Sequence, residues 1–213
     1  DDTEHTNLTH ISSLQRIFPE SYIWMDRFTM KNLELFNSNS INGFNLSDTI
    51  DETITSMGSR KLKSWIAFPL IDKKEIKKRQ EIVQSIMSDD EISRLLDINL
   101  NNISDIERLM SKIATYKISP REIVNLKSSL ENVDLIKDSL LVYSGVLKNY
   151  GKSLPSSKSI IREISMTLKD DSPVSILKGD FIKDGFSKEL DGLREIRSSG
   201  KEYLNQILER ETK

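Results

Sequence analysis

The chain has 213 residues, with 31 lysines and arginines against 33 aspartates and glutamates, and a formal net charge of −2. Its length suits one large domain or two small ones, and its 37% hydrophobic and 30% charged residues are typical of a soluble protein with a thin core and an extended shape. The absence of cysteine excludes disulfide scaffolds, thiolate zinc sites and cysteine nucleophiles. Glycine (8) and proline (5) are scarce, which disfavours folds built on hairpins and favours long helices.

The ends of the chain carry no targeting signal. No apolar run approaches the ~18 residues that a bilayer-spanning helix needs, and no signal peptide opens the sequence, so we expect an intracellular protein with no membrane partner. The chain begins at Asp1 without an initiator methionine and ends inside a predicted helix. We therefore expect a fragment of a longer polypeptide.

The first part of the chain is predicted to be a connection followed by a short helix. Residues 1–21 are polar and mixed, which is typical of a tail or linker, and the helical part is expected to span 22–213. Asp26 is predicted to cap the first helix. A polar loop is expected to follow at 37–43.

Two short helices are predicted next, at 47–55 and 59–68, with a hinge at Met57 and Gly58. The two tryptophans of the chain, Trp24 and Trp65, stand among apolar neighbours in the sequence. Large aromatic side chains in such surroundings usually anchor a core, so we expect both to be buried.

Capping boxes mark four further helix starts. In a capping box, the side chain of a Ser, Thr or Asp cap accepts a hydrogen bond from the backbone amide of the third helical residue. The side chain of a glutamate at that third position in turn accepts a hydrogen bond from the backbone amide of the cap. The clearest example is Ser119-Pro120-Arg121-Glu122, because proline at the first helical position has its φ already set. The same pattern occurs at 72–75, 88–91 and 104–107. Apolar residues at 3–4 spacing follow each start, so the sequence predicts an all-α fold.

One long helix is predicted from Pro120 to about Tyr150, since apolar residues continue at helical spacing over that range. A turn is expected at 151–157, a shorter helix at 159–168, and an extended loop at 174–184.

A second long helix is predicted from Ser187 to the last residue. Its apolar positions step by three or four residues and form a narrow seam of the kind that packs on a partner helix. The members of this seam are Phe186, Leu190, Leu193, Ile196, Gly200, Tyr203 and Ile207. Neither glycine, proline nor a cap follows them, so we expect a helix that continues past Lys213.

Candidate catalytic patterns are weak. Gly145–Ser153 resembles a phosphate-binding P-loop, but it has five residues between its glycines where four are needed, and it follows a predicted helix where a strand is needed. A helix that ends at a glycine explains it better. His5 and His10 are the only histidines and would point about 140° apart on a helix, without an obvious third ligand. We therefore expect no catalytic residue, no metal site and no cofactor site in the fragment.

The most basic segment is 60–80, where eight lysines and arginines stand against Asp72 and Glu75. Such a cluster is either a solvated helix face or a nucleic-acid footprint. Because the chain as a whole is slightly acidic, we expect weak DNA contact at most. The candidate residues are Lys73, Lys74, Lys77, Lys78 and Arg79.

Four blocks of the chain resemble, in order, the core domain of the MutS family of DNA mismatch-recognition ATPases. The first is Trp24–Leu35, which is similar to the family's "MD…T…NLEL" opening. The other blocks are Thr53–Trp65 with Pro69-Leu70, Asp105–Leu109 with Ser119–Glu122, and Ile182–Phe186 with Glu189–Asp191 and Leu193-Arg194. They extend over nearly the whole chain, so the resemblance is far more specific than any single motif.

The resemblance implies a core with two long lever helices that lead to a DNA-gripping clamp. Residues 1–21 would then be a linker from a preceding connector domain, and 22–213 the core and first lever, ending before the clamp. The parent is expected to bind mismatched double-stranded DNA through its clamp and N-terminal domain, and to bind ATP and Mg²⁺ in a separate ATPase domain. It is also expected to form a homodimer and to act in the bacterial cytoplasm. Phe18-Pro19-Glu20 matches the letters of the family's mismatch-reading motif but lacks its surroundings.

This fragment is therefore expected to be a structural and coupling part of such a parent and not an enzyme itself. Two alternatives stay open on the sequence. The parent is a MutS relative acting in recombination, or the chain is a helical protein-interaction scaffold without a role on DNA.

Overall fold

The computed structural model describes residues 21–211, and the side-chain environments of residues 21–200, as ten α-helices and a short 3₁₀ turn. The helices are α1 (Arg27–Asn32), α2 (Leu46–Ile50), α3 (Ser56–Ala67), α4 (Lys73–Met87), α5 (Asp90–Asn101), α6 (Ile106–Ala114), α7 (Pro120–Val142), α8 (Gly145–Ser153), α9 (Lys158–Thr167) and α10 (Lys188–Glu211). Over the described range there is no sheet, only two isolated antiparallel bridges, Tyr22 with Leu70 and Leu168 with Ile182. The all-α prediction is confirmed.

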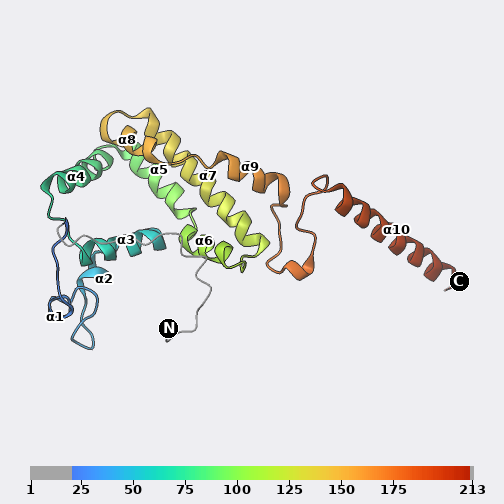
Figure 1. The fold of residues 1–213 in the computed structure, drawn as a ribbon, viewed down its shortest axis with the longest axis horizontal. Coiled ribbons are helices and arrows are strands. Elements are labelled where there is room, and N and C mark those ends of the chain that lie inside the picture. The colour runs from blue at the N-terminus through green and yellow to red at the C-terminus, as the bar shows by residue number, and fades with distance from the viewer. Residues whose placement is uncertain (1–20, 212–213) are drawn as a thin grey trace.

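Helix α7 is the centre of the molecule (Figure 1). It packs against α5, α6, α8 and α9, while α4 packs against α5 and α8. The buried core lies where α5, α7 and α8 meet, and consists of Ile92, Ile136, Leu140 and Leu147. Helices α1 to α3 lie at one end of this bundle, and α10 projects from the other end (Figure 1). Across the part of the chain that is described, no helix is long and apolar enough to cross a membrane.

The helix starts follow from their caps. The predicted cap Asp26 accepts from the Thr29 amide at 2.7 Å, and Asp72 accepts from the Lys74 amide at 2.8 Å. Two predicted boxes are shifted by one residue, because the caps of α5 and α6 are Asp89 and Asp105 and not the serines that precede them. An aspartate beside a serine competes for the same role, and the carboxylate is also favoured by the positive end of the helix dipole.

The predicted box at Ser119 is confirmed. Its hydroxyl accepts from the Glu122 amide at 3.3 Å, and the Glu122 carboxylate accepts from the Ser119 amide at 3.0 Å. Glu122 also forms an ion pair with Lys112 of α6. The Lys112 ammonium, together with the Ser119 amide, lowers the pKa of Glu122 from 4.5 to about 2. This carboxylate thus starts α7 and joins it to α6.

Replacing Glu122 with glutamine should destabilise the chain by about 1 kcal/mol at pH 7, since a partly buried ion pair is lost and the bond from the Ser119 amide is no longer made to a charged acceptor. A carboxylate whose pKa is lowered by folding stabilises the protein above its usual pKa, and this contribution disappears as the pH falls from about 4.5 to about 2. Thermal unfolding of both proteins between pH 7 and pH 2.5 should show their midpoints converging. Glu131→Gln, at an exposed position of the same helix, is the control; a gap that stays constant with pH would contradict the assignment.

The predicted long helix from Pro120 to Tyr150 is wrong as a single element. Helix α7 ends at Val142, and α8 begins at Gly145, where φ is +63°. Glycine adopts this left-handed conformation without strain, so the chain turns here and α8 folds back onto α7. The expected turn at 151–157 accordingly begins later, because Gly151 still belongs to α8.

The two short helices predicted near residue 57 differ from the structure. Helix α2 covers only Leu46–Ile50, after the cap Asn45. Helix α3 starts earlier than expected and runs without a hinge through Gly58, whose amide donates to the Thr55 hydroxyl at 3.0 Å. A glycine within the first helical turn therefore serves the cap and does not act as a hinge. The polar loop expected at 37–43 is confirmed.

The last third of the described chain agrees with the prediction. The helix expected at 159–168 corresponds to α9, and the stretch expected to be an extended loop is irregular apart from the 3₁₀ turn Ile176–Lys178 and the bridge residue Ile182. The final helix begins one residue after Ser187 as α10, and Phe186, Leu193 and Ile196 of its apolar seam are exposed. The predictions on residues 1–20, which include His5, His10 and Phe18, lie outside the described residues.

Candidate functional site

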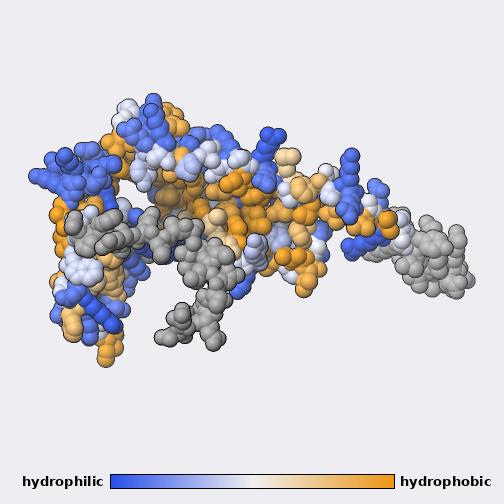
Figure 2. All heavy atoms as spheres, in the orientation of Figure 1, coloured by the Kyte–Doolittle hydropathy of each residue, from blue (hydrophilic) through white to orange (hydrophobic). Residues whose placement is uncertain are grey.

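Helix α4 carries the basic side chains singled out in the sequence. Lys73, Lys74, Lys77 and Lys78 are all exposed, and Lys78 has only a long ion-pair distance of 3.9 Å to Glu75. The space-filling view shows a continuous hydrophilic surface over this helix (Figure 2). These four side chains, which we call the α4 lysines, present four positive charges to solvent within two helical turns.

Arg79, the fifth candidate, is used within the fold. Its guanidinium carbon lies 3.9 Å from the centre of the Trp65 ring, a cation–π contact that joins α4 to the end of α3. Trp65 is 41% exposed and Trp24 is 72% exposed, so the prediction that both are core anchors is wrong. Trp65 supports an arginine at the surface, and Trp24 precedes the short helix α1, which buries no residue.

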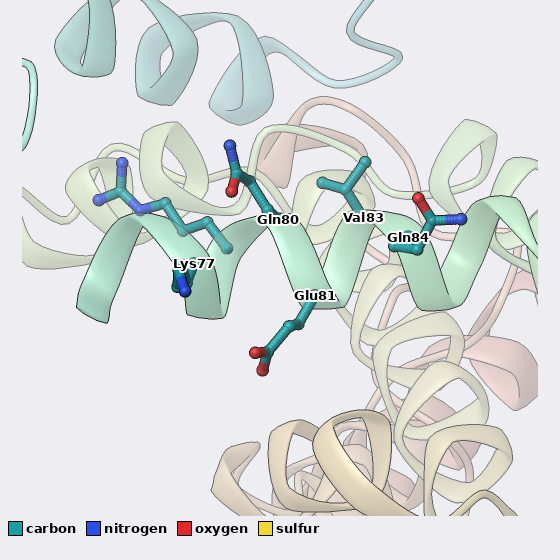
Figure 3. Close-up of a pocket in the computed structure, with 6 residues that line it drawn as sticks. Lys77, Gln80, Glu81, Val83 and Gln84 are labelled. Carbon is teal, nitrogen blue, oxygen red and sulfur yellow. The ribbon is translucent and has the colours of Figure 1, made fainter. Parts of the chain in front are cut away.

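An open depression lies along α4, but its lining does not form a binding site. The residues around it are Lys77, Arg79, Gln80, Glu81, Val83 and Gln84. Figure 3 shows that these side chains do not converge: Gln80 and Val83 leave one side of the helix, and Glu81 leaves the opposite side. Ligand sites need polar groups aimed at one point, so this surface suits a broad electrostatic contact better than a bound small molecule.

Arg60, from the same basic segment, also has partners within the fold. Its guanidinium donates to Asp105 at 2.7 and 2.8 Å and to Glu107 at 2.6 and 2.9 Å, which ties α3 to the start of α6. The Arg60 guanidinium holds the pKa of Asp105 down to about 2. Two of the eight basic side chains of segment 60–80 are therefore structural, a role that only long-range contacts reveal.

The P-loop-like pattern is a packing feature. Gly145 starts α8 at a left-handed φ, and Gly151 lies inside α8 against α7. The pattern does follow a helix, as expected, but Gly145 begins a second helix and Gly151 lies within it, so neither glycine ends a helix as predicted. A Cβ on Gly151 would come within 2.9 Å of the Leu140 Cβ, so this position is a close helix–helix approach and does not face a phosphate.

The hollow inside the bundle lacks reactive groups. An apolar cavity of about 420 Å³ lies between α4, α5, α7 and α8, and its lining includes only Thr55 and Tyr150 as polar residues. No three His, Cys, Asp or Glu side chains of the described part of the chain gather into a metal-ion site. The geometry thus offers a basic surface, a central bundle and a projecting helix.

Comparison with known proteins identifies the family. The family model described as MutS domain III matches residues 28–212. The DNA mismatch repair protein MutS of Christiangramia forsetii is 45% identical over 212 residues, which cover 99% of this chain and 24% of that protein. The chain belongs to the MutS family. The MutS proteins of Flavobacterium johnsoniae and Bacteroides fragilis are 45% and 41% identical, over 99% and 100% of this chain. The chain spans about a quarter of the length of these curated relatives.

Membership in the MutS family confirms the resemblance found in the four sequence blocks. In the structure these blocks coincide with helix starts and connections. The first contains α1, the second opens α3, the third opens α6 and α7, and the fourth leads into α10. MutS domain III is therefore recognisable here by the residues that begin and join its helices.

Proposed function

We propose that this chain is the core and first lever of a MutS-type mismatch-recognition protein, in which it links an ATPase domain to a DNA clamp. The observation that carries the proposal is α10, a helix of 24 residues that leaves the bundle at the end opposite α1 to α3 (Figure 1). At 1.5 Å per residue it reaches about 36 Å. A packed bundle with a long projecting helix suits the transmission of a movement, and we assign it no catalytic step.

The activities of the whole parent belong to this proposal. The relatives that the chain resembles are bacterial DNA mismatch repair proteins about four times its length. We infer that the parent binds mismatched double-stranded DNA and ATP with Mg²⁺ through domains outside these residues, works as a homodimer and acts in the bacterial cytoplasm. The proposal places no ATP, metal or cofactor on this chain.

A role in mismatch repair is favoured over a role in recombination because the three relatives described above are all named DNA mismatch repair proteins. The full-length parent, expressed in a bacterial strain that lacks its own MutS, should restore a low spontaneous mutation rate. An unchanged mutator phenotype with normal expression of the parent would contradict the proposal and favour the recombination branch.

We also propose that the α4 lysines make weak contact with the DNA backbone. Among residues 21–200, the only ion pair of these four exposed lysines is the long one between Lys78 and Glu75, which makes them a suitable footprint for phosphates, whereas Arg60 and Arg79 are held by other residues. A chain with a net charge of −2 should bind duplex DNA no more tightly than ~10⁻⁵ M at physiological salt.

Changing the four α4 lysines to glutamine should abolish most of this binding and weaken its salt dependence. Each lost phosphate contact reduces the slope of log K against log salt concentration by about 0.9. The matched control changes Lys148, Lys152, Lys158 and Arg162, four exposed basic residues of α8 and α9, to glutamine. Both variants have the same net charge, so fluorescence anisotropy titrations separate position from total charge. Equal losses in the two variants would contradict a footprint on α4.

A further inference from the structure

Helix α10 is attached to the rest of the molecule only near its start. In the described part of the chain, α10 has no extensive packing with any other helix, and every residue from Glu195 to Gly200 is exposed. Its direction must therefore be set by the contacts of its first two turns with the connection that precedes it.

That connection is itself fastened to α9. Leu168 and Ile182 form an antiparallel bridge, in which the Lys169 amide donates to the Phe181 carbonyl at 2.9 Å and the Lys183 amide donates to the Thr167 carbonyl at 2.8 Å. The Lys183 ammonium also donates to the Ser165 carbonyl at 2.7 Å. Residues 181–183 thus have a fixed position at the end of α9.

Arg194 joins α10 to this fixed segment. Its Nη2 donates to the Ile182 carbonyl at 2.8 Å, and its Nη1 donates to Asp184 at 2.5 Å and to Asp191 at 3.3 Å. The Arg194 side chain is only 27% exposed, although it lies on a projecting helix. The planar guanidinium fork can hold several acceptors in fixed directions at once, which a lysine ammonium on its flexible stem does far less well.

Two aspartates complete the joint between α9 and α10, by which we mean the contacts of Arg194 and Lys169 with residues 180–185. Asp180 lies 3.9 Å from Arg194 and 2.6 Å from the Lys169 ammonium at the end of α9, so it links the two cations. Asp191 uses its second oxygen to accept from the Gly185 amide at 2.8 Å, where a left-handed φ of +83° turns the chain into α10. Arg194 is therefore the centre of a network that includes the end of α9, the connection and the second turn of α10.

We propose that Arg194 is the positioning residue that sets the direction of α10 relative to α9 and the bundle. The proposal deepens the coupling role and rests on it for its significance, because a lever transmits a movement only if its base is held. Small changes at the base are amplified along the helix: a swing of 20° about Arg194 would displace the end of α10, about 25 Å away, by roughly 9 Å.

The test measures the direction of α10 directly. The chain has no cysteine, so Ile160→Cys on α9 and Ser198→Cys on α10, both exposed positions, give one pair of spin labels. Pulsed dipolar spectroscopy of the labelled 213-residue chain should give one narrow distance distribution. Arg194→Gln should broaden it to at least twice its width, and Arg194→Lys should give an intermediate width.

Arg60→Gln is the matched control, because Arg60 also holds two carboxylates but lies between α3 and α6, far along the chain from this joint. It should leave the distance distribution unchanged. An unchanged distance distribution in Arg194→Gln would overturn the proposal. Equal broadening by Arg60→Gln would also overturn it, because the broadening would then reflect a less rigid fold as a whole and not the loss of the Arg194 contacts. The measurement involves neither ATP nor DNA, so its failure is distinguishable from a failure of the proposed function.

Discussion

Replacing Ile92 with alanine should lower the free energy of unfolding by about 2–5 kcal/mol, the range observed when a large aliphatic side chain is removed from a packed core. Ile92 of α5 is 1% exposed and packs in the cluster that joins α5, α7 and α8. On the size scaling for domains of about 200 residues, the midpoint of thermal unfolding should fall by roughly 5–15 °C. Calorimetry or circular dichroism measures this shift.

The same helix offers the control for this prediction. Ile98 is 65% exposed on α5, so Ile98→Ala removes the same atoms without leaving a cavity, and its effect should stay within about 0.5 kcal/mol. Equal effects of the two substitutions would mean that α5 does not face α7 in the way described.

Gly151→Ala should destabilise the chain by about 1–3 kcal/mol, although alanine is the better helix former. An added Cβ would lie 2.9 Å from the Leu140 Cβ and 3.3 Å from the backbone of Leu140 and Leu141. Since these atoms belong to α7 itself, relief requires α8 to move away from α7.

Gly192→Ala provides the matched comparison, because Gly192 lies within α10 and has nothing within 4 Å of the added carbon. There the gain in helix propensity of up to about 1 kcal/mol is unopposed, so the substitution should be neutral or stabilising. Chemical denaturation of both variants measures the difference. Stabilisation by both would show that α8 is not held closely against α7.

The fold class and most helix starts were predictable from local signals. Caps such as Asp26, Asp72 and Ser119 act within one turn of backbone, so the sequence around them contains the whole interaction. The break between α7 and α8 was missed because the apolar residues continue at helical spacing across it. The available signal was the dipeptide Ser144-Gly145, a common mark of a turn.

The basic surface was predictable only in part. The α4 lysines are exposed, as a polar helix face suggests, but Arg79 contacts Trp65 and Arg60 contacts Asp105, which lies 45 positions further along the chain. Contacts of this range depend on how the helices pack and leave no trace in local composition. The same holds for Arg194, which the sequence shows only as part of a family block. Its partners are Asp191 of α10 and two residues of the connection before α10, Asp184 and the Ile182 carbonyl.

The proposed coupling role is tested most directly in the full-length parent, by measuring whether mismatched DNA stimulates ATP hydrolysis. Insertion of Gly-Ser-Gly between Gly185 and Phe186 would separate α10 from the segment 181–183 that is fastened to α9, and the same insertion after Ile41, in the exposed loop before α2, is the control. We expect the first insertion to abolish the stimulation while basal hydrolysis and nucleotide-free binding of mismatched DNA stay within about twofold, and the control to behave as the unmodified parent. Normal stimulation with the first insertion would contradict the proposal that this domain couples the two ends of the protein.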